Sequence, residues 1–200
     1  MTRRRAAWAL GGLLAATAPA ARAEDKPRIQ PSRDVAVTYR VEGEAASAVP
    51  GGIPGALRLS WDAAGQRLRA EPDGRTQAVI VDLRAHSVQM VDTALRSALT
   101  LPVRGADLQP LTLDGAKLTR RGEEVVAGLP CTAWAVQSPR GAGTVCFTAD
   151  GVALRADGEV DGRRGAFTAS NVSYGPQRDE LFRVPSDYMQ FAMPKLGRTR

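Results

Sequence analysis

The sequence predicts a mainly β protein whose core is a curved antiparallel meander sheet with few short helices. Three observations favour this class. Apolar residues alternate with polar ones at a period of two, as at Val35, Val37, Tyr39 and Val41. Asp-Gly dipeptides, which favour the tight turns of β-hairpins, recur between such segments. The two cysteines of the chain fall on the two arms of one expected hairpin.

The cysteine hairpin is expected within residues 131–157, the segment around which the sheet is organised. Pairing about its central turn sets Cys131 directly across from Cys146. Opposed residues of antiparallel strands lie about 4.5–5.5 Å apart at Cα, a separation that a disulfide can span. The same pairing places Trp134 opposite Gly143, on the face away from the cysteines. We therefore predict one structural disulfide, with a reactive thiol or metal-binding pair as the alternative.

The Asp150-Gly151 dipeptide follows the second arm of this hairpin. Such a pair supplies the positive φ angles of a type I′ turn. Residues 152–156 are expected to fold back as a third strand, followed by Asp157-Gly158 and Asp161-Gly162 as turn dipeptides.

The first 23 residues have the features of an export signal. Three arginines at positions 3–5 precede a weakly apolar run, and Ala21-Arg22-Ala23 forms an Ala-x-Ala cleavage motif. We expect a signal peptide over residues 1–23 that is cleaved after export by the Sec or the twin-arginine route, leaving a periplasmic chain without a transmembrane anchor. A disordered or anchoring N-terminus is the alternative. The expected remainder is a loose arm (24–34), a single β-rich domain (35–193) and a polar tail (194–200).

The charge of the expected mature chain is close to balanced. The full chain has 27 basic and 21 acidic residues, and four of the basic residues are arginines within the signal. This balance removes the main compositional support for nucleic-acid binding.

A basic stripe is expected on the hairpin of residues 57–70. Its apolar residues point to one face of the sheet, which Trp134 is also expected to share: Leu57, Leu59, Trp61 and Leu68. Its arginines point to the other face: Arg58, Arg67 and Arg69. Pairing centred on the turn at residues 62–65 sets Arg58 opposite Arg69, and like charges at such positions destabilise a sheet. The stripe is either a solvated face or a patch that meets an anionic partner.

Several other segments lead to narrower expectations. The continuous apolar run at residues 78–81 indicates a strand covered on both faces. Residues 93–101 fit a short helix or a further edge strand, and we expect the large apolar residues of segment 179–191 to dock it on the sheet. His86 is interpreted as a polar strand-end residue rather than a catalytic base, because no aligned nucleophile accompanies it.

Three segments of the C-terminal half carry a familiar pattern: GEEVVAGLPCTAWAV from Gly122, VCFTADGVALRA from Val145 and YGPQRDELFRVPSDY from Tyr174. Together they resemble a family of exported bacterial domains of unknown function, which is distantly similar to the LolA/LolB-like lipoprotein carriers and the LppX-type lipid binders. The resemblance covers about residues 116–190. It implies a LolA-like half-barrel, a strongly curved antiparallel sheet over an apolar cavity, and it implies no catalytic residues.

The function expected from these features is that of a periplasmic soluble binding or carrier protein for a lipid, a lipoprotein acyl chain or another hydrophobic ligand. The alternative is an envelope interaction or sensory module that binds a protein partner and no small molecule. The sequence contains no Gly-x-Ser-x-Gly elbow, metal-ligand cluster or phosphate loop. We therefore expect no enzymatic activity, cofactor or metal.

Overall fold

The computed structural model describes residues 26–44, 55–103 and 113–193. The expected signal peptide and C-terminal tail lie outside these residues. The elements are β1 (Val35–Gly43), β2 (Ala56–Asp62), β3 (Arg67–Pro72), β4 (Gln77–Asp82), β5 (Ser87–Asp92), β6 (Ser97–Pro102), β7 (Lys117–Val126), β8 (Leu129–Ser138), β9 (Gly141–Phe147), β10 (Ala153–Val160), β11 (Arg163–Tyr174), the 3₁₀ helix η3 (Asp179–Phe182) and β12 (Met189–Ala192).

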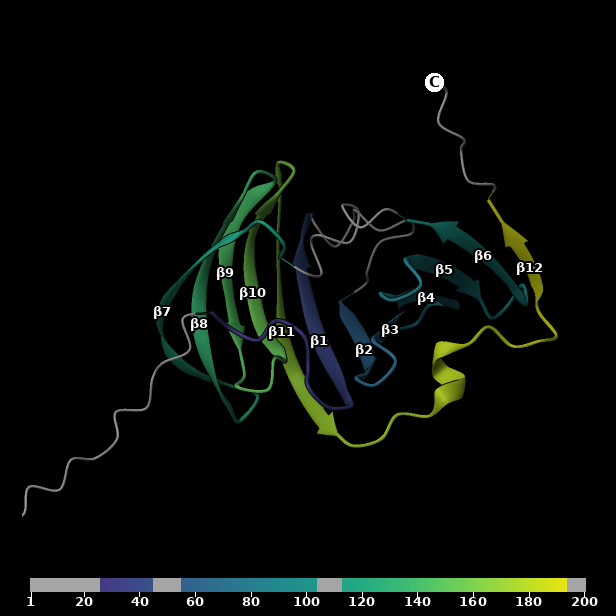
Figure 1. Ribbon diagram of the computed structural model, residues 1–200, viewed down its shortest axis with the longest axis horizontal. Helices are drawn as coiled ribbons and strands as arrows, with labels where there is room; N and C mark the ends of the chain where they lie inside the picture. Colours follow the sequence, from purple (N-terminus) through teal and green to yellow (C-terminus); the bar gives the residue numbers. More distant parts are fainter. Residues whose placement is uncertain (1–25, 45–54, 104–112, 194–200) are drawn as a thin grey trace, which may run out of the picture.

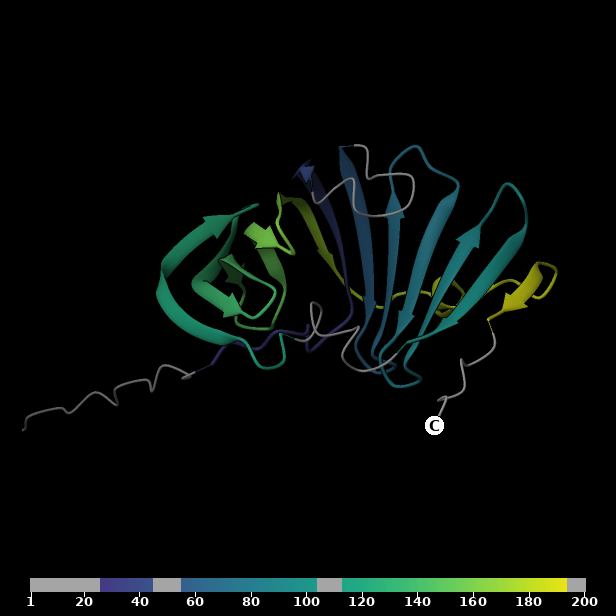
Figure 2. The ribbon, with the colours of Figure 1, turned by 90° about the horizontal axis from the view of Figure 1, so that it is seen from above.

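The twelve strands within the described residues belong to one sheet, in the order β12-β6-β5-β4-β3-β2-β1-β11-β10-β9-β8-β7 (Figure 1). Every neighbouring pair is antiparallel except β12 with β6, which is parallel. The sheet is strongly curved but does not close into a barrel (Figure 2). The predicted mainly β, curved antiparallel class is confirmed.

Three hairpin turns in the first half of the sheet share one design. Asp62, Asp82 and Asp92 each end a strand, and each accepts a hydrogen bond through Oδ1 from the backbone N–H three residues later, at 2.7–3.0 Å. The fourth turn residue has a positive φ in each case: Gln66, His86 and Arg96. His86 is therefore a turn residue in the left-handed region, which His tolerates better than bulky side chains do. The third turn also decides residues 93–101, which form a turn and then β6 rather than a helix.

The cysteine hairpin is formed by β8 and β9, with Cys131 and Cys146 joined in a disulfide at a Cα separation of 5.5 Å. The predicted disulfide is confirmed, but the predicted register is wrong by two residues. Ala133 lies opposite Cys146, and Trp134 lies opposite Val145 rather than Gly143. The turn is centred one residue later than expected, and the disulfide joins diagonal neighbours. Because side chains alternate with a period of two, the shift leaves the assignment of faces unchanged.

Two Asp-Gly dipeptides differ from the expected turns. Only Gly151 of the Asp150-Gly151 pair has a positive φ, and Thr148 N–H donates to Val152 O at 2.9 Å, so the loop holds three residues instead of two. Asp157-Gly158 lies inside β10 rather than in a turn. The other expected dipeptide, Asp161-Gly162, does form a turn, and both of its residues have the positive φ of type I′ geometry.

The β2–β3 hairpin is also shifted by two residues from the predicted pairing. Arg58 lies opposite Glu71, Arg69 opposite Ser60, and Arg67 opposite Asp62. The expected Arg58–Arg69 juxtaposition is therefore wrong, and no like-charge penalty arises there. The four-residue turn at residues 63–66 causes the shift, because it places Asp62 and Arg67 as its closing pair.

The N-terminal arm, expected to be loose, is held against the sheet over residues 31–34. Trp61 Nε1 donates to Pro31 O at 2.9 Å, and Ser32 N–H donates to Asp150 O at 2.9 Å. Asp34 accepts the backbone N–H groups of Ala63 and Gln177.

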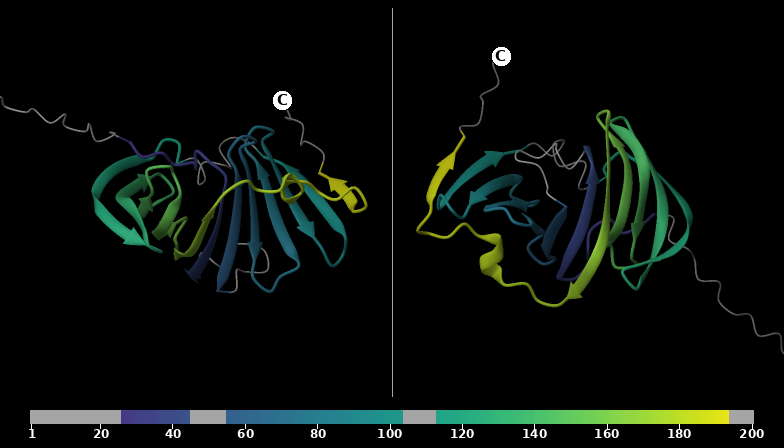
Figure 3. Two further views of the ribbon diagram at one scale, coloured as in Figure 1. Left: turned by 90° about the horizontal axis from the view of Figure 1, so that it is seen from below. Right: turned by 180° about the vertical axis from the view of Figure 1, so that it is seen from behind.

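The segment after β11 crosses one face of β2–β6, as the view from below shows (Figure 3, left). Phe182 of η3 is buried, and Val184 and Tyr188 pack against Ile80 and its neighbours. The segment then ends in β12 beside β6. This is the docking expected for residues 179–191, and it covers one face of the apolar run at residues 78–81.

Candidate functional site

The sheet has an inner face, defined by Val37, Leu59 and Phe167, which the register places on one side. The opposite, outer face carries Arg67, Arg69 and Ile80. An apolar hollow of about 580 Å³ lies on the inner face, between β1–β3 and β8–β11. This volume lies within the range of small-molecule sites, roughly 300–1,000 Å³. The hollow is the candidate site.

The walls of the hollow come from the alternation seen in the sequence. On β1, Tyr39 and Val41 face inward, and on β2 the inward residues are Leu57, Leu59 and Trp61. The second half of the sheet supplies Val136, Val145, Phe147, Ala153, Ala156 and Phe167. These side chains offer aliphatic and aromatic surface, which suits an apolar ligand.

Tyr39 has its polar group satisfied within the protein. Its hydroxyl donates to Ala153 O at 2.7 Å, and its ring packs edge-to-face on Phe167 with centroids 5.0 Å apart. Burial raises the pKa of the Tyr39 phenol far above its ordinary value, and the nearby Tyr174 adds to the effect. The phenol therefore stays neutral, and it contributes an apolar ring rather than an acid or a base.

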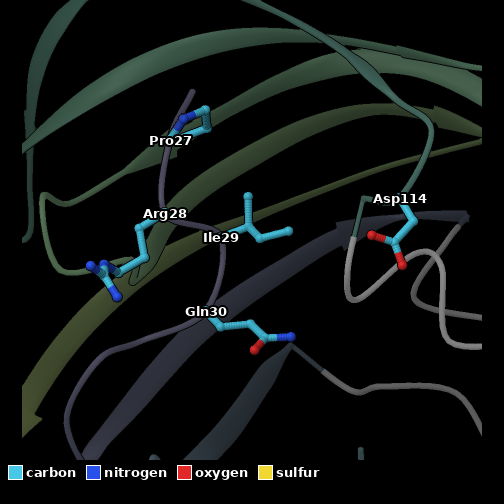
Figure 4. A pocket seen from close by; sticks show the side chains of 5 residues that line it. All are labelled: Pro27, Arg28, Ile29, Gln30 and Asp114. Carbon is cyan, nitrogen blue, oxygen red and sulfur yellow. The ribbon is translucent and has the colours of Figure 1, made fainter. Parts of the chain in front are cut away.

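The N-terminal arm lines the hollow beside Trp61 through Ile29, Gln30 and Pro31. Ile29 packs with the cluster of Trp134, Val145 and Phe147. Figure 4 shows Ile29 and Gln30 extending toward the side where Asp114 lies, while Arg28 extends away. The arm thus forms part of the wall of the site.

Asp150 fastens the arm to the β9–β10 loop. Arg33 Nε donates to Asp150 Oδ2 at 2.9 Å, and the Tyr174 hydroxyl donates to Oδ1 at 3.1 Å. The Arg33 guanidinium lies 3.7 Å from the centroid of the Tyr174 ring. Desolvation acts to raise the pKa of Asp150, but hydrogen bonds from Thr148, Arg33 and Tyr174 outweigh it and lower that pKa. Gly151 lets the arm approach, because a Cβ there would lie 2.3 Å from Gln30 O.

Four glycines stand opposite one another on four neighbouring strands, toward the strand ends remote from Trp61. Gly43 pairs with Gly165, Gly165 with Gly158, and Gly158 with Gly143. A Cβ at Gly143 would lie 2.3 Å from Asp157 O, and one at Gly158 would lie 2.6 Å from Ala142 O. Glycine at such positions allows a sharp bend or the close approach of a ligand to the backbone. The close backbone contacts indicate that the row lets neighbouring strands bend sharply toward one another.

The apolar inner face continues beyond the hollow toward the far edge of the sheet. The register aligns Ala70, Val79, Met90 and Leu99 across β3–β6, and Phe191 of β12 pairs with Leu99. Val79, Met90 and Leu99 are only partly buried, and Phe191 is exposed. The apolar surface is therefore larger than the hollow itself.

The predicted apolar residues all fall on the inner face. Four of them line the hollow: Leu57, Leu59, Trp61 and Leu68. Trp134 shares this face through its pairing with Val145, but it is buried with Ile29 and Phe147 beside the hollow.

The three arginines of the predicted stripe lie on the outer face, but they differ in exposure and in their partners. Arg58 is exposed. Arg67 bridges Asp62 at 2.5 Å and Asp179 at 2.6 Å, and Arg69 reaches Glu71 at 2.9 Å and Leu181 O at 3.1 Å. Two of the three thus have partners in their own chain, under the segment that follows β11. An anionic partner for Arg58, Arg67 and Arg69 stays a prediction.

Asp62 is the acidic partner of this network. Desolvation acts to raise its pKa, but hydrogen bonds from the Gly65 N–H and from Arg67 outweigh it, so the pKa of Asp62 lies below its ordinary value. Asp62 and Arg67 therefore stay paired as ions at neutral pH.

The described residues contain no group of three or more His, Cys, Asp and Glu side chains arranged to hold a metal ion. Among the same residues, no helix is long and apolar enough to cross a membrane.

Comparisons with known proteins show a shared fold at low sequence identity. No protein-family model matches the chain, and no curated protein matches it. Among solved structures, an uncharacterized conserved protein from Thermus thermophilus superposes with a TM-score of 0.55 at 16% identity, over 81% of this chain and 91% of that one. MucB superposes with a TM-score of 0.53 at 17% identity, over 82% of this chain and 62% of the MucB chain. The chain thus spans less than two thirds of MucB.

The lipoprotein LppX from Mycobacterium tuberculosis also matches, with a TM-score of 0.44 at 16% identity over 72% of this chain and 88% of that one. This score is too low to support a functional argument. The fold resemblance expected from the sequence is found in the structures that superpose with TM-scores above 0.5.

The glycine row and the wall formed by the arm were missed by sequence reasoning. Each glycine belongs to a different strand, so the row exists only once the register is known. The arm lacks alternation and contains prolines, which is typical of a linker. The closeness of Ile29 to Phe147 has no signal in the sequence.

Proposed function

We propose that the protein binds an apolar ligand, such as the acyl chain of a lipid or lipoprotein, in the hollow of the inner face. The observation that carries the proposal is the hollow itself, whose walls are aliphatic and aromatic residues from β1–β3 and β8–β11. Burying apolar surface of the ligand there gains about 25 cal/mol per Å² removed from water.

The proposal is one of binding rather than catalysis. The Tyr39 hydroxyl already donates to a backbone carbonyl, and burial keeps it protonated. The place of action is proposed to be the periplasm, on the strength of the signal-like first 23 residues. A carrier role follows if the ligand is released to an acceptor.

The test is a titration of the purified full chain with cis-parinaric acid, a fluorescent fatty acid. We expect saturable binding, with energy transfer from Trp61, and displacement by unlabelled palmitate. The change Ala156→Phe places a ring in the hollow and should weaken binding at least tenfold. The matched control is Ala94→Phe on the exposed β5–β6 turn, which should bind as the parent does.

The outcome that would contradict the proposal is an absence of saturable binding, or equal binding by the Ala156→Phe and Ala94→Phe variants. Thermal unfolding followed by circular dichroism checks that both variants are folded. Without apolar binding, an envelope interaction module without a small-molecule ligand becomes the better account.

A further inference from the structure

The two edge strands of the sheet differ in charge and in regularity. β7 carries Lys117, Arg120, Arg121, Glu123 and Glu124, and its pairing with β8 is interrupted by a bulge between Arg120 and Gly122. Charges and bulges are the usual means by which an edge strand avoids pairing with another chain. β12 has the sequence MQFA, with no charge, and its pairing shows no bulge.

The position of β12 is fixed by its connection to the rest of the protein. Val184 and Tyr188, just before it, pack against the cluster of Ile80, Val91 and Ala98. Arg96 pairs with Asp187 and lies over the ring of Tyr188. The edge is therefore presented in a defined place rather than on a free tail.

The backbone of β12 leaves one row of groups without partners. Met189 N–H donates to Arg96 O at 2.9 Å, and Met193 N–H donates to Thr100 O at 3.1 Å. Successive residues of a strand direct these groups to opposite sides. The N–H and C=O groups of Gln190 and Ala192 therefore point away from β6, and no described strand pairs with this side.

The side chains of β12 add apolar surface to this open edge. Met189, Phe191 and Met193, on the strand and directly after it, are 61%, 56% and 51% exposed, and they are three of the six exposed large hydrophobic residues in the described part of the chain. The pairing of Phe191 with Leu99 places it on the apolar inner face. A strand added beside β12 would extend that face.

We propose that the free edge of β12 binds an extended segment of another protein, which adds to the sheet as one further strand. The unpaired groups of Gln190 and Ala192 require an extended backbone as their partner. Beside Phe191 the segment must be apolar, while its alternate residues face outward and can be polar. A second copy of this chain fits less well, because a ladder on a four-residue strand buries far less than the roughly 1,000 Å² that a stable dimer needs.

Proline at residue 190 tests this edge without touching the ladder to β6. Its missing N–H is the one that points outward, and proline is tolerated in edge strands at such positions. Gln190→Pro should leave the melting temperature within a few degrees of the control Gln190→Ala, because neither change removes a hydrogen bond to β6. This pair isolates the outward backbone group from the loss of the glutamine side chain.

The probe is a fluorescein-labelled ten-residue peptide in which Val and Thr alternate between two terminal lysines, followed by fluorescence anisotropy with the full chain. Saturable binding is expected to the parent and to Gln190→Ala, and binding about tenfold weaker to Gln190→Pro, since one hydrogen bond and the fit of the strand are lost. A peptide with Ser in place of every Val should bind more weakly than the Val peptide.

An N-methylated peptide and sedimentation velocity distinguish the remaining outcomes. The same peptide, N-methylated at alternate residues along one edge, is tested on the parent protein, and loss of its binding supports the proposal even if Gln190→Pro fails to fold. No binding of the Val peptide to the parent, or equal binding to Gln190→Pro and Gln190→Ala, would overturn the proposal. Sedimentation velocity showing a parent dimer that Gln190→Pro abolishes would assign the edge to a second copy instead. None of these readouts depends on a ligand in the hollow.

Discussion

The outer and inner faces of β2–β6 are built from the same strands, but only the outer face is covered by the segment that follows β11. The outer face carries Arg67 and Arg69, yet their side chains are only 21% and 11% exposed, because residues 178–188 cover them. The inner face is apolar, yet Phe191, which continues this face onto β12, is 56% exposed. Alternation shows that two faces differ, but the partners available in the rest of the chain decide which face is covered.

The segment after β11 can cover charged residues because it supplies their partners. Asp179 meets Arg67, the carbonyl of Leu181 meets Arg69, and the Phe182 ring lies 5.1 Å from the Arg67 guanidinium. Buried charges are tolerated only when they are paired in this way. On the inner face, the N-terminal arm lies beside Trp61 and forms part of the wall of the hollow.

The largest expected effect comes from removing the aromatic anchor of the covered face. Phe182→Ala should lower the free energy of unfolding by about 3 kcal/mol, since a buried phenylalanine is lost and the docked segment with it. Phe191→Ala, the same change on the inner face, should alter stability by less than about 0.5 kcal/mol. Urea unfolding of both variants measures the difference. Equal losses would mean that the two faces contribute alike.

A smaller effect is expected within the predicted basic stripe. Arg67→Gln leaves Asp62 without its cation and Asp179 with Arg183 alone, and should destabilise the fold by about 2 kcal/mol, less than for a fully buried pair because the site is partly exposed. Arg58→Gln, on the same face but exposed, should cost less than about 0.5 kcal/mol. Chemical denaturation of the two variants gives the comparison, and a stable Arg67→Gln protein would contradict the role of the network.

The smallest expected effect is a dependence of stability on acid. The pKa of Asp62 is lower in the folded protein than its ordinary value of 3.8, so its contribution is present above that value and is lost as the pH falls through the folded pKa. The melting temperature of the parent should therefore drop steeply below about pH 4. Asp62→Asn should flatten this drop, whereas Asp73→Asn, on an exposed turn, should leave the slope unchanged. Identical slopes for all three proteins would show that Asp62 does not cause the loss of stability in acid.

Much of the sheet could be predicted from local patterns. The strand at residues 35–43 and the pairing of Cys131 with Cys146 follow from alternation and from two cysteines on one hairpin. The assignment of side chains to the two faces stayed correct despite two register errors, because a shift of two residues returns every side chain to the same side. The register of each hairpin depends on the residue at which its turn begins, near Asp62 in β2–β3 and near Pro139 in β8–β9. A difference of one residue in that position is not visible in hydropathy.

The candidate site was less predictable because it depends on contacts distant in sequence. Leu57, Leu59, Trp61 and Leu68 were assigned to one apolar face, and the structure places them in the wall of the hollow. Phe167 and Val145 join them only through the order β2-β1-β11-β10-β9, in which strands far apart in the chain become neighbours. The burial of Arg69 likewise depends on its hydrogen bond to the carbonyl of Leu181, which is more than a hundred positions away in the sequence.

Native mass spectrometry shows directly whether the hollow of the inner face holds an apolar ligand. The protein is purified from its host without detergent and measured before and after extraction with organic solvent. We expect an added mass in the range of a lipid or fatty acid. Extraction should remove it, and it should be absent from Ala156→Phe but present in Ala94→Phe. A mass equal to that of the polypeptide alone, in every preparation and after incubation with palmitate, would contradict the account.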